Sequence, residues 1–299
     1  MPAVVQSAFE SWSLPVPITF ALLLTACIYA RGWIRLRSAF AGVTSAWRLV
    51  AFMSGLATVW IAAGSPLAAL DDALLSIHMV QHILLMAIAP PLILLGAPAL
   101  PLLHGFSQRF VRSMLGPLFR STVLQRLGRT ATHPVFAWLA ATLALLVWHF
   151  PAAFELGLRS AWWHEAEHAS FFVTGLLFWW PVVQPWPSVA RWPRWSIPVY
   201  LFLATLPCDT LSAFLAFCDR VVYPSYLSAP RLLSVSPLQD QECAGALMWA
   251  CATFSYLIPA VVVTIQILSR PGGHAPEQSR TAWNGVAAQS TVASKVEVV

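Results

Sequence analysis

Long apolar stretches recur along the chain and alternate with short segments of polar residues. A transmembrane helix needs about 20 mainly apolar residues, and the chain contains seven candidate stretches. Water cannot satisfy backbone groups inside lipid, and these stretches lack the alternation of barrel strands, so we expect helices. The stretches lie near residues 16–34, 47–64, 74–96, 133–150, 166–184, 197–217 and 244–268. The pattern predicts an all-α fold, namely a polytopic membrane helix bundle of seven transmembrane helices.

The composition agrees with a membrane protein. Of the 299 residues, 58% are hydrophobic and only 10% are charged, whereas a soluble domain has roughly 25% charged residues. The formal net charge of +5 comes from loop arginines and not from one basic face, so it does not indicate a nucleic-acid partner. No soluble domain of useful size remains between the apolar stretches. We therefore expect the protein to act in or at the lipid bilayer.

Basic residues are distributed unevenly between the loops. Most of the Lys and Arg residues lie in the first, third and fifth loops and after the last apolar stretch. Such an excess is typical of the cytoplasmic side. Acidic residues fall mainly on the other side, for example Asp71, Asp72, Glu165 and Glu167. The distribution predicts a multi-pass protein with an external N-terminus and a cytoplasmic C-terminus.

Polar segments suggest how the chain is divided. Residues 1–269 are expected to form one transmembrane domain. Residues 270–299 are polar and have no apolar period, which predicts a disordered cytoplasmic tail. Residues 97–132 are rich in Arg, Pro and Gly, and their apolar residues recur at helical spacing. They predict a cytoplasmic loop that contains a short interfacial helix.

Prolines mark expected helix ends and distortions. Pro134 occupies a favourable first position for the fourth helix, and Pro151 should end that helix. Pro90 and Pro91 fall within the inner half of the third stretch. Because proline lacks a backbone N–H and clashes with the preceding turn, we expect a kink there.

Five histidines fall at helix ends on the predicted external side. His78 and His82 are four residues apart, as are His164 and His168, so the two rings of each pair share a helix face. His149 lies at the outer end of the fourth stretch. Imidazole nitrogen suits copper, zinc and iron. If the three helix ends converge, they form a shared transition-metal site at the outer membrane surface.

Softer and acidic donors would add to this site. Met248 and Cys251 are three residues apart and share a helix face in the last stretch, and thioether or thiolate donors favour copper(I). Asp209 is an ionisable residue within an apolar stretch, which makes it a functional candidate. We take Asp209, Asp240 and Met248 as secondary metal ligands and copper as the expected metal.

The cysteines restrict the haem chemistry. Five are present, and none belongs to a C-x-x-C-H pattern, which excludes covalent haem attachment by that signature. Cys218 and Cys243 flank the last predicted external loop, so a disulfide between them is an open alternative that needs a distance to decide it.

Three other functions compete with copper binding. Residues 164–168 read H-E-x-x-H, the pattern of zinc metalloproteases, but no second protease element accompanies it. Histidines on three helices could instead hold haem b in a membrane electron-transfer protein, although close pairs suit a small ion better. Metal transport would need ionisable groups through the whole bilayer, and the inner halves of the stretches are almost wholly apolar. We therefore expect a non-enzymatic protein, with zinc or haem as less favoured cofactors.

Three sequence segments resemble a known family. The first is His78-Met79-Val80-Gln81-His82 with Pro90-Pro91 and Gly96-Ala97-Pro98; the second is Trp148-His149-Phe150-Pro151 with His164, His168 and Phe178-Trp179-Trp180-Pro181; the third is Asp240-Gln241-Glu242-Cys243-Ala244-Gly245-Ala246-Leu247-Met248-Trp249. From about residue 20 to 268 the chain resembles the multi-span CtaG-type cytochrome c oxidase assembly factors.

The resemblance implies a function. It implies that the protein assists copper insertion into cytochrome c oxidase, as a copper chaperone whose partners are oxidase subunits. It also implies a location in the bacterial plasma membrane. Cys208, Cys218 and Cys243 are not part of the family pattern, so the resemblance gives no support to thiol ligands. The oligomeric state is left open.

Overall fold

The computed structural model describes residues 15–37, 44–185, 192–231 and 235–269, and every regular element in these ranges is a helix. The long helical stretches are α2 (Val16–Leu36), α3 (Ala46–Gly64), α5 (Leu75–Ile83) continued by η1 (Leu84–Ile88) and α6 (Ala89–Leu95), α11 (Pro134–His149), α13 (Ala161–Val183), α14 (Ser196–Phe217) and α16 (Pro237–Leu268). The short elements are α4 (Leu67–Leu70), α7 (Ala99–Gly105), α8 (Gln108–Phe110), η2 (Val111–Leu115), α9 (Gly116–Arg120), α10 (Thr122–Ala131), α12 (Pro151–Arg159) and α15 (Ser225–Ser228). The predicted disordered tail, 270–299, lies outside the described residues.

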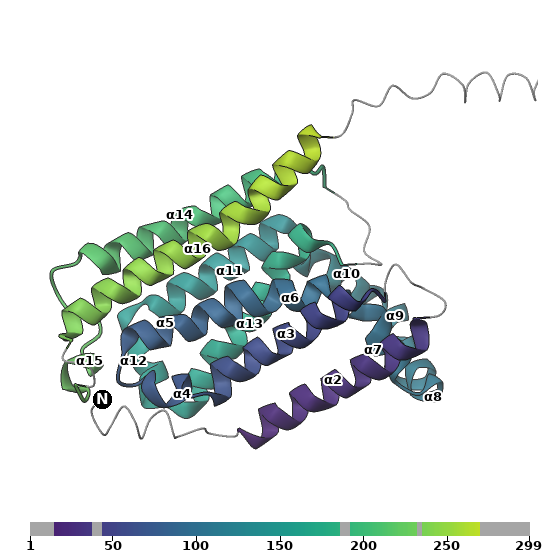
Figure 1. The fold of residues 1–299 in the computed structure, drawn as a ribbon, viewed down its shortest axis with the longest axis horizontal. Coiled ribbons are helices and arrows are strands. Elements are labelled where there is room, and N and C mark those ends of the chain that lie inside the picture. Colours follow the sequence, from purple (N-terminus) through teal and green to yellow (C-terminus); the bar gives the residue numbers. More distant parts are fainter. Residues whose placement is uncertain (1–14, 38–43, 186–191, 232–234, 270–299) are drawn as a thin grey trace, which may run out of the picture.

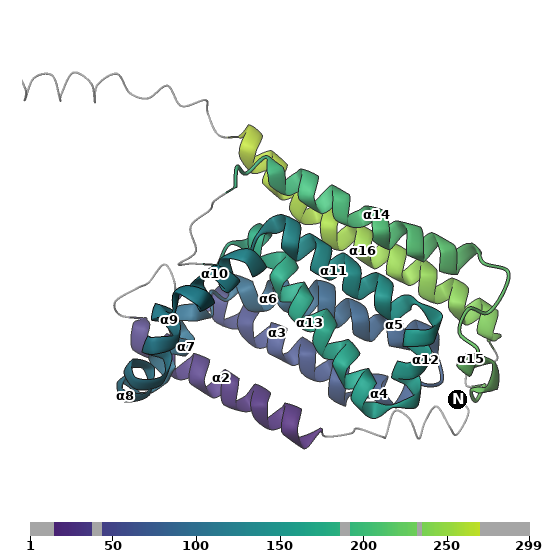
Figure 2. The same cartoon turned by 180° about the vertical axis from the view of Figure 1, so that it is seen from behind.

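The long helices run between two ends of an elongated bundle. In Figure 1, α14 and α16 lie side by side along one edge, and α2 forms the opposite edge. Short elements α7 to α10 gather at one end, while α4, α12 and α15 gather at the other, as the view from behind in Figure 2 confirms. We call these the α7–α10 end and the α4–α12 end. The first carries the arginines of residues 97–132, and the second carries Asp71 and Asp72.

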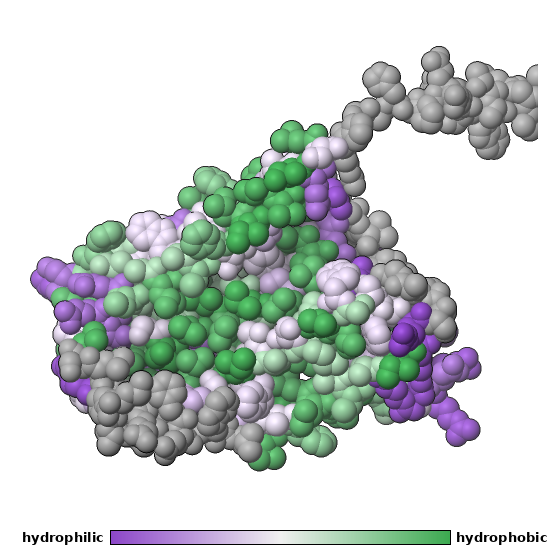
Figure 3. All heavy atoms as spheres, viewed as in Figure 1, coloured by the Kyte–Doolittle hydropathy of each residue, from purple (hydrophilic) through white to green (hydrophobic). Residues whose placement is uncertain are grey.

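An apolar surface between the ends agrees with a membrane protein. Figure 3 shows hydrophobic side chains over the middle of the bundle and hydrophilic ones at its ends. Within the described ranges, five helical segments are long and apolar enough to cross a membrane: Val16–Leu36, Ala46–Leu70, Leu75–Leu95, Ser196–Phe217 and Pro237–Leu268. The pair α10 and α11, bent by 67°, would make a sixth. The protein is therefore a multi-pass helical protein, while seven spans and the orientation of the termini stay predictions.

The helix expected near 166–184 is present as α13. It is 23 residues long and starts earlier than predicted, at Ala161. Its first turns carry His164, Glu165, Glu167 and His168, so its composition alone does not identify it as a membrane span. Those polar turns bring α13 into the candidate site.

Prolines act largely where the sequence predicts. α11 begins at Pro134 and ends at His149, and Pro151 begins α12. The expected distortion at Pro90 takes the form of the π-helical turn η1 directly before α6. Because Pro90 has no N–H for the carbonyl of Met86, that oxygen instead accepts a hydrogen bond from the indole of Trp179, at 3.1 Å. This contact ties α13 to the α5–α6 span.

Residues 97–132 form several short helices instead of the one interfacial helix that the spacing of their apolar residues predicts. Pro98, Pro101 and Pro117 interrupt the backbone hydrogen bonds of a longer helix. Many of the apolar side chains here, including Met114 and Leu118, are exposed, as expected for helices that lie on lipid headgroups.

Candidate metal centre

Three helix segments bring the five predicted histidines together. The first turns of α5 carry His78 and His82, the first turns of α13 carry His164 and His168, and α11 ends at His149. The ring centroids of His78 and His82 are 4.4 Å apart, and those of His164 and His168 are 4.2 Å apart. Between helices, the rings of His78 and His164 are 5.5 Å apart and those of His82 and His149 are 5.8 Å apart. The three helix ends therefore converge, as the sequence predicted.

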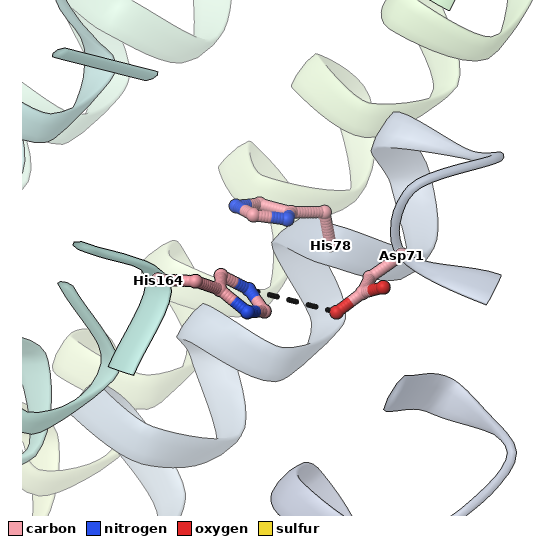
Figure 4. A group of neighbouring side chains, drawn as sticks. All are labelled: Asp71, His78 and His164. Atoms are coloured by element: carbon pink, nitrogen blue, oxygen red, sulfur yellow. Dashed lines mark ion pairs between the residues drawn. The ribbon is translucent and has the colours of Figure 1, made fainter. Parts of the chain in front are cut away.

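One group of possible ligands combines Asp71, His78 and His164. Each offers one ligand atom, and these atoms all lie within 4.8 Å of one another. Figure 4 shows the three side chains turned towards a common space, with Nε2 of His164 3.5 Å from Oδ2 of Asp71. A carboxylate and two imidazoles are suitable ligands for a divalent transition metal.

A second group combines His78, His82 and Glu167, again with ligand atoms within 4.8 Å of one another. Oε1 of Glu167 lies 3.3 Å from Nε2 of His82 and 3.7 Å from Nε2 of His78. Glu167 was not among the ligands predicted from the sequence. It is three residues from His164, so the two side chains share a helix face, and this spacing was the available signal.

Buried atoms in these groups lack hydrogen bonds. Among the described residues, no hydrogen-bond partner is present for either ring nitrogen of His78 and His82, for either carboxylate oxygen of Glu167, or for Nε2 of His164 and His168. Each unsatisfied buried polar group costs about 1–3 kcal/mol. A bound metal would satisfy several of them at once. The donor set therefore fits a transition-metal ion such as copper or zinc.

A cavity of about 350 Å³ at the α4–α12 end reaches these ligands. Asp71, His164 and His168 line it, together with Gln81 and Glu165. An ion can therefore approach the first group through the cavity. Glu165, which the zinc-protease pattern would use as the general base, is exposed, whereas Glu167 is fully buried between histidines.

Asp71 lies between two helical spans, and its surroundings are well defined. Burial raises the pKa of its carboxyl from 3.8 to about 6, although the attraction of His78 acts in the opposite direction. The backbone N–H of Asp72 donates a hydrogen bond to Oδ1 at 2.8 Å, which leaves Oδ2 towards His164. The hydroxyl of Tyr226 donates to the backbone carbonyl of Asp71, also at 2.8 Å, and so fixes this turn.

His149 lies at the α11 edge of the cluster and is buried. Its Nδ1 lies 2.8 Å from the carbonyl oxygen of Leu145, one turn earlier in α11. Its Nε2 lies 3.4 Å from the sulfur of Met79. The hydroxyl of Tyr223 donates to the backbone carbonyl of His149 at 3.0 Å, which holds the end of α11.

Asp240, which the sequence predicted as a secondary ligand, contacts the start of α5. Its Oδ2 accepts a hydrogen bond from the N–H of Leu75 at 2.6 Å, and its Oδ1 accepts from the N–H of Ser76 at 3.3 Å and the hydroxyl of Ser76 at 2.5 Å. α5 has no side-chain cap of its own. Asp240 in α16 therefore caps the helix that carries His78 and His82, and both of its oxygens are engaged there.

The two remaining secondary candidates are Asp209 and Met248. Asp209 lies in α14 and is in neither ligand group, although its Oδ1 has no hydrogen-bond partner within the described residues. Met248 is buried in the larger hydrophobic core, with residues such as Leu215 and Tyr256. Cys218 and Cys243, considered above as a disulfide pair, are both free thiols.

One glycine fits closely against this arrangement. A Cβ atom at residue 157 would lie 2.8 Å from Oε2 of Glu167, closer than real Cβ contacts, so the carboxylate would have to shift. With glycine at this position, α12 lies directly over the buried carboxylate without displacing it. α12 covers the site without supplying a ligand.

Comparison with known proteins gives distant relatives. The uncharacterized protein Mb0105 of Mycobacterium bovis is 26% identical over 301 residues, covering 90% of this chain and 44% of its own length. The uncharacterized protein ML1998 of Mycobacterium leprae is 24% identical, covering 88% of this chain and 40% of its own length. The chain thus spans less than half the length of these relatives, and no solved structure matches it. A family model described as cytochrome c oxidase caa3 assembly factor matches residues 27–270, and the chain therefore belongs to this family.

Proposed function

We propose that this protein assists cytochrome c oxidase assembly by binding a copper ion at the outer face of the membrane and passing it to an oxidase subunit. One observation carries the proposal: five histidines and two buried carboxylates from separate elements meet, and many of their ligand atoms have no hydrogen-bond partner among the described residues. Family membership supplies the link to the oxidase.

The position of the cluster supports delivery at one face. It is adjacent to the α4–α12 end, opposite the arginines of α8 to α10, and Lys and Arg excess is typical of the cytoplasmic side. The cavity beside Asp71 and His164 opens at the same end. An ion bound there would exchange with the external side without crossing the bilayer.

The two ligand groups also support release of the ion. Both include His78, so an ion can exchange Asp71 and His164 for His82 and Glu167 without leaving protein ligands. A closed cage with one fixed ligand set would exchange its ion slowly. In this proposal copper is cargo, and the chain's residues hold it temporarily.

Metal analysis of protein purified in detergent tests the proposal. The variant His78→Ala with His82→Ala removes ligands from both groups and is expected to lower copper affinity by at least about tenfold. The matched control is His104→Ala, because His104 lies in α7 at the other end of the bundle. Unchanged copper binding in the double variant would overturn the proposal.

The same sample separates the alternatives. Haem b would give a Soret absorption band, and zinc would replace copper in the metal analysis. Proteolysis would require Glu165, so Glu165→Gln would abolish cleavage of a membrane substrate.

A further inference from the structure

A methionine sulfur lies directly against a ring nitrogen of the cluster. Sδ of Met79 is 3.4 Å from Nε2 of His149. Met79 is fully buried, and His149 is 4% exposed. Met79 is adjacent in sequence to His78, but this contact directs it to the α11 side of the cluster.

Neither atom of this contact has a hydrogen to donate. Nδ1 of His149 lies 2.8 Å from the carbonyl oxygen of Leu145, which can only accept, so Nδ1 carries the ring hydrogen. Nε2 then presents a lone pair, and a thioether sulfur also has only lone pairs. A second ring hydrogen would bury a positive charge beside the other imidazoles, at a large cost in free energy. The sulfur of Met79 and Nε2 of His149 are therefore both electron-pair donors, and they lie side by side.

The separation suits a shared ion. With a metal–nitrogen bond of about 2.0 Å and a metal–sulfur bond of about 2.3 Å, a nitrogen–sulfur distance of 3.4 Å corresponds to an angle of roughly 100° at the metal. This angle is ordinary for an ion with three or four ligands. An angle of this size excludes linear two-coordinate binding by these two atoms. The ion therefore needs a third ligand.

His82 can provide that ligand. Its ring centroid is 5.8 Å from that of His149, and two imidazoles on one ion have centroids about 5–6 Å apart. Both ring nitrogens of His82 are without hydrogen-bond partners in the described chain. The buried ring of Phe171 lies against both imidazoles, at 4.4 Å from His82 and 6.1 Å from His149, and covers this position with apolar surface.

We propose that Met79, His149 and His82 form a second metal subsite, which binds copper(I). Two imidazoles and a thioether in an apolar environment favour copper(I), whereas the groups that contain Asp71 or Glu167 suit divalent ions. His82 belongs to both the Glu167 group and this subsite, so an ion can pass between them by ligand exchange. The subsite takes copper(I) that arrives in that oxidation state, so no electron transfer is involved. This inference rests on the proposed copper function and adds a specificity for the oxidation state.

The variant Met79→Leu tests the subsite. Leucine is close to methionine in volume, so the core is expected to tolerate it, but it has no sulfur. The matched control is Met53→Leu, in which the methionine packs against the separate core around Tyr29 and Phe52. We expect Met79→Leu to lower copper(I) affinity at least tenfold, measured anaerobically on the full chain by competition with a copper(I) chelator. Zinc(II) affinity should change less than twofold in both variants.

X-ray absorption at the copper edge provides a second readout. The wild-type protein loaded with copper(I) should show one sulfur ligand, and Met79→Leu should show none. A wild-type spectrum without sulfur, with copper still bound, would overturn the subsite and leave the proposed function standing. Equal losses of copper(I) and zinc(II) affinity in Met79→Leu would also overturn it, because they would indicate general damage to α5. Absence of copper binding in the wild type would overturn both proposals.

Discussion

Glu167 illustrates how a single residue changes the chemistry of the site. It is fully buried, yet neither oxygen of its carboxylate has a hydrogen-bond partner in the described part of the chain. Its Oε1 lies 3.7 Å from Nε2 of His78 and 3.3 Å from Nε2 of His82, and both of these side chains are ionisable. A buried carboxyl group in this state needs either a nearby cation or a proton of its own, because an isolated buried charge is costly.

Glu167→Gln is expected to weaken divalent metal binding by at least about tenfold, because it keeps the shape of the side chain but removes the anionic ligand. Zinc(II) or copper(II) titration of the purified protein measures the effect. Glu165→Gln is the matched control, since Glu165 is on the same helix but exposed. Equal effects of the two substitutions would show that Glu167 acts only through net charge.

Residue spacing predicted part of the site. The two pairs of histidines four apart indicated shared helix faces, and these pairs do meet. Met79, Asp71 and Glu167 were not predicted as candidate ligands. Contacts with other elements are what place Met79 and Asp71 beside the histidines, whereas the spacing of Glu167 from His164 was a signal in the sequence. Asp240 was predicted as a ligand, but sequence hydropathy gives no information about the uncapped start of α5 that it binds.

At the scale of elements, Asp240 links α16 to α5. The buried N–H of Leu75 would be left without a partner if this carboxylate were removed. The first turn of α5 would then loosen, and it carries His78. Asp240 is thus a positioning residue for the site.

Asp240→Ala is expected to lower the free energy of unfolding by about 1–3 kcal/mol, because it leaves buried backbone N–H groups unsatisfied. Asp240→Asn should retain most of the stability and of the metal affinity, since asparagine is also a good cap. Denaturant unfolding and zinc(II) titration measure the two quantities. If Asp240→Asn lost metal affinity as strongly as Glu167→Gln, Asp240 would be a ligand after all.

Element boundaries show what hydropathy can detect. The apolar stretches located the long helices, but α16 begins at Pro237, seven residues before the predicted 244. Its first turns are polar, and of their residues Asp240 and Gln241 are buried. Gln241 forms hydrogen bonds with the backbone of Leu215, Arg220 and Val222. The short helices α4, α12 and α15 were not predicted for a similar reason, since tertiary contacts and not apolar periodicity maintain them.

At the scale of the whole molecule, metal binding should be linked to stability. The proposed ligands come from α5, α13 and the turn before α5, which pack together only in the folded bundle. An ion that binds the folded protein alone stabilises it by about 2.7 kcal/mol at a free concentration of 100 times its dissociation constant.

Thermal unfolding in detergent tests this linkage. Zinc(II) or copper should raise the midpoint temperature of the wild-type protein, and the His78→Ala, His82→Ala double variant should show little rise. A chelator should reverse the wild-type shift. An equal rise in both proteins would indicate that metal acts elsewhere on the chain.

The glycine of α12 has a further consequence for the ion. Residue 157 has no side chain, and this leaves the space that Oε2 of Glu167 occupies. A methyl group there would require that oxygen to shift, and with it the carboxylate that faces His78 and His82. In the proposed site, α12 would therefore influence where this carboxylate meets an ion without contributing a ligand.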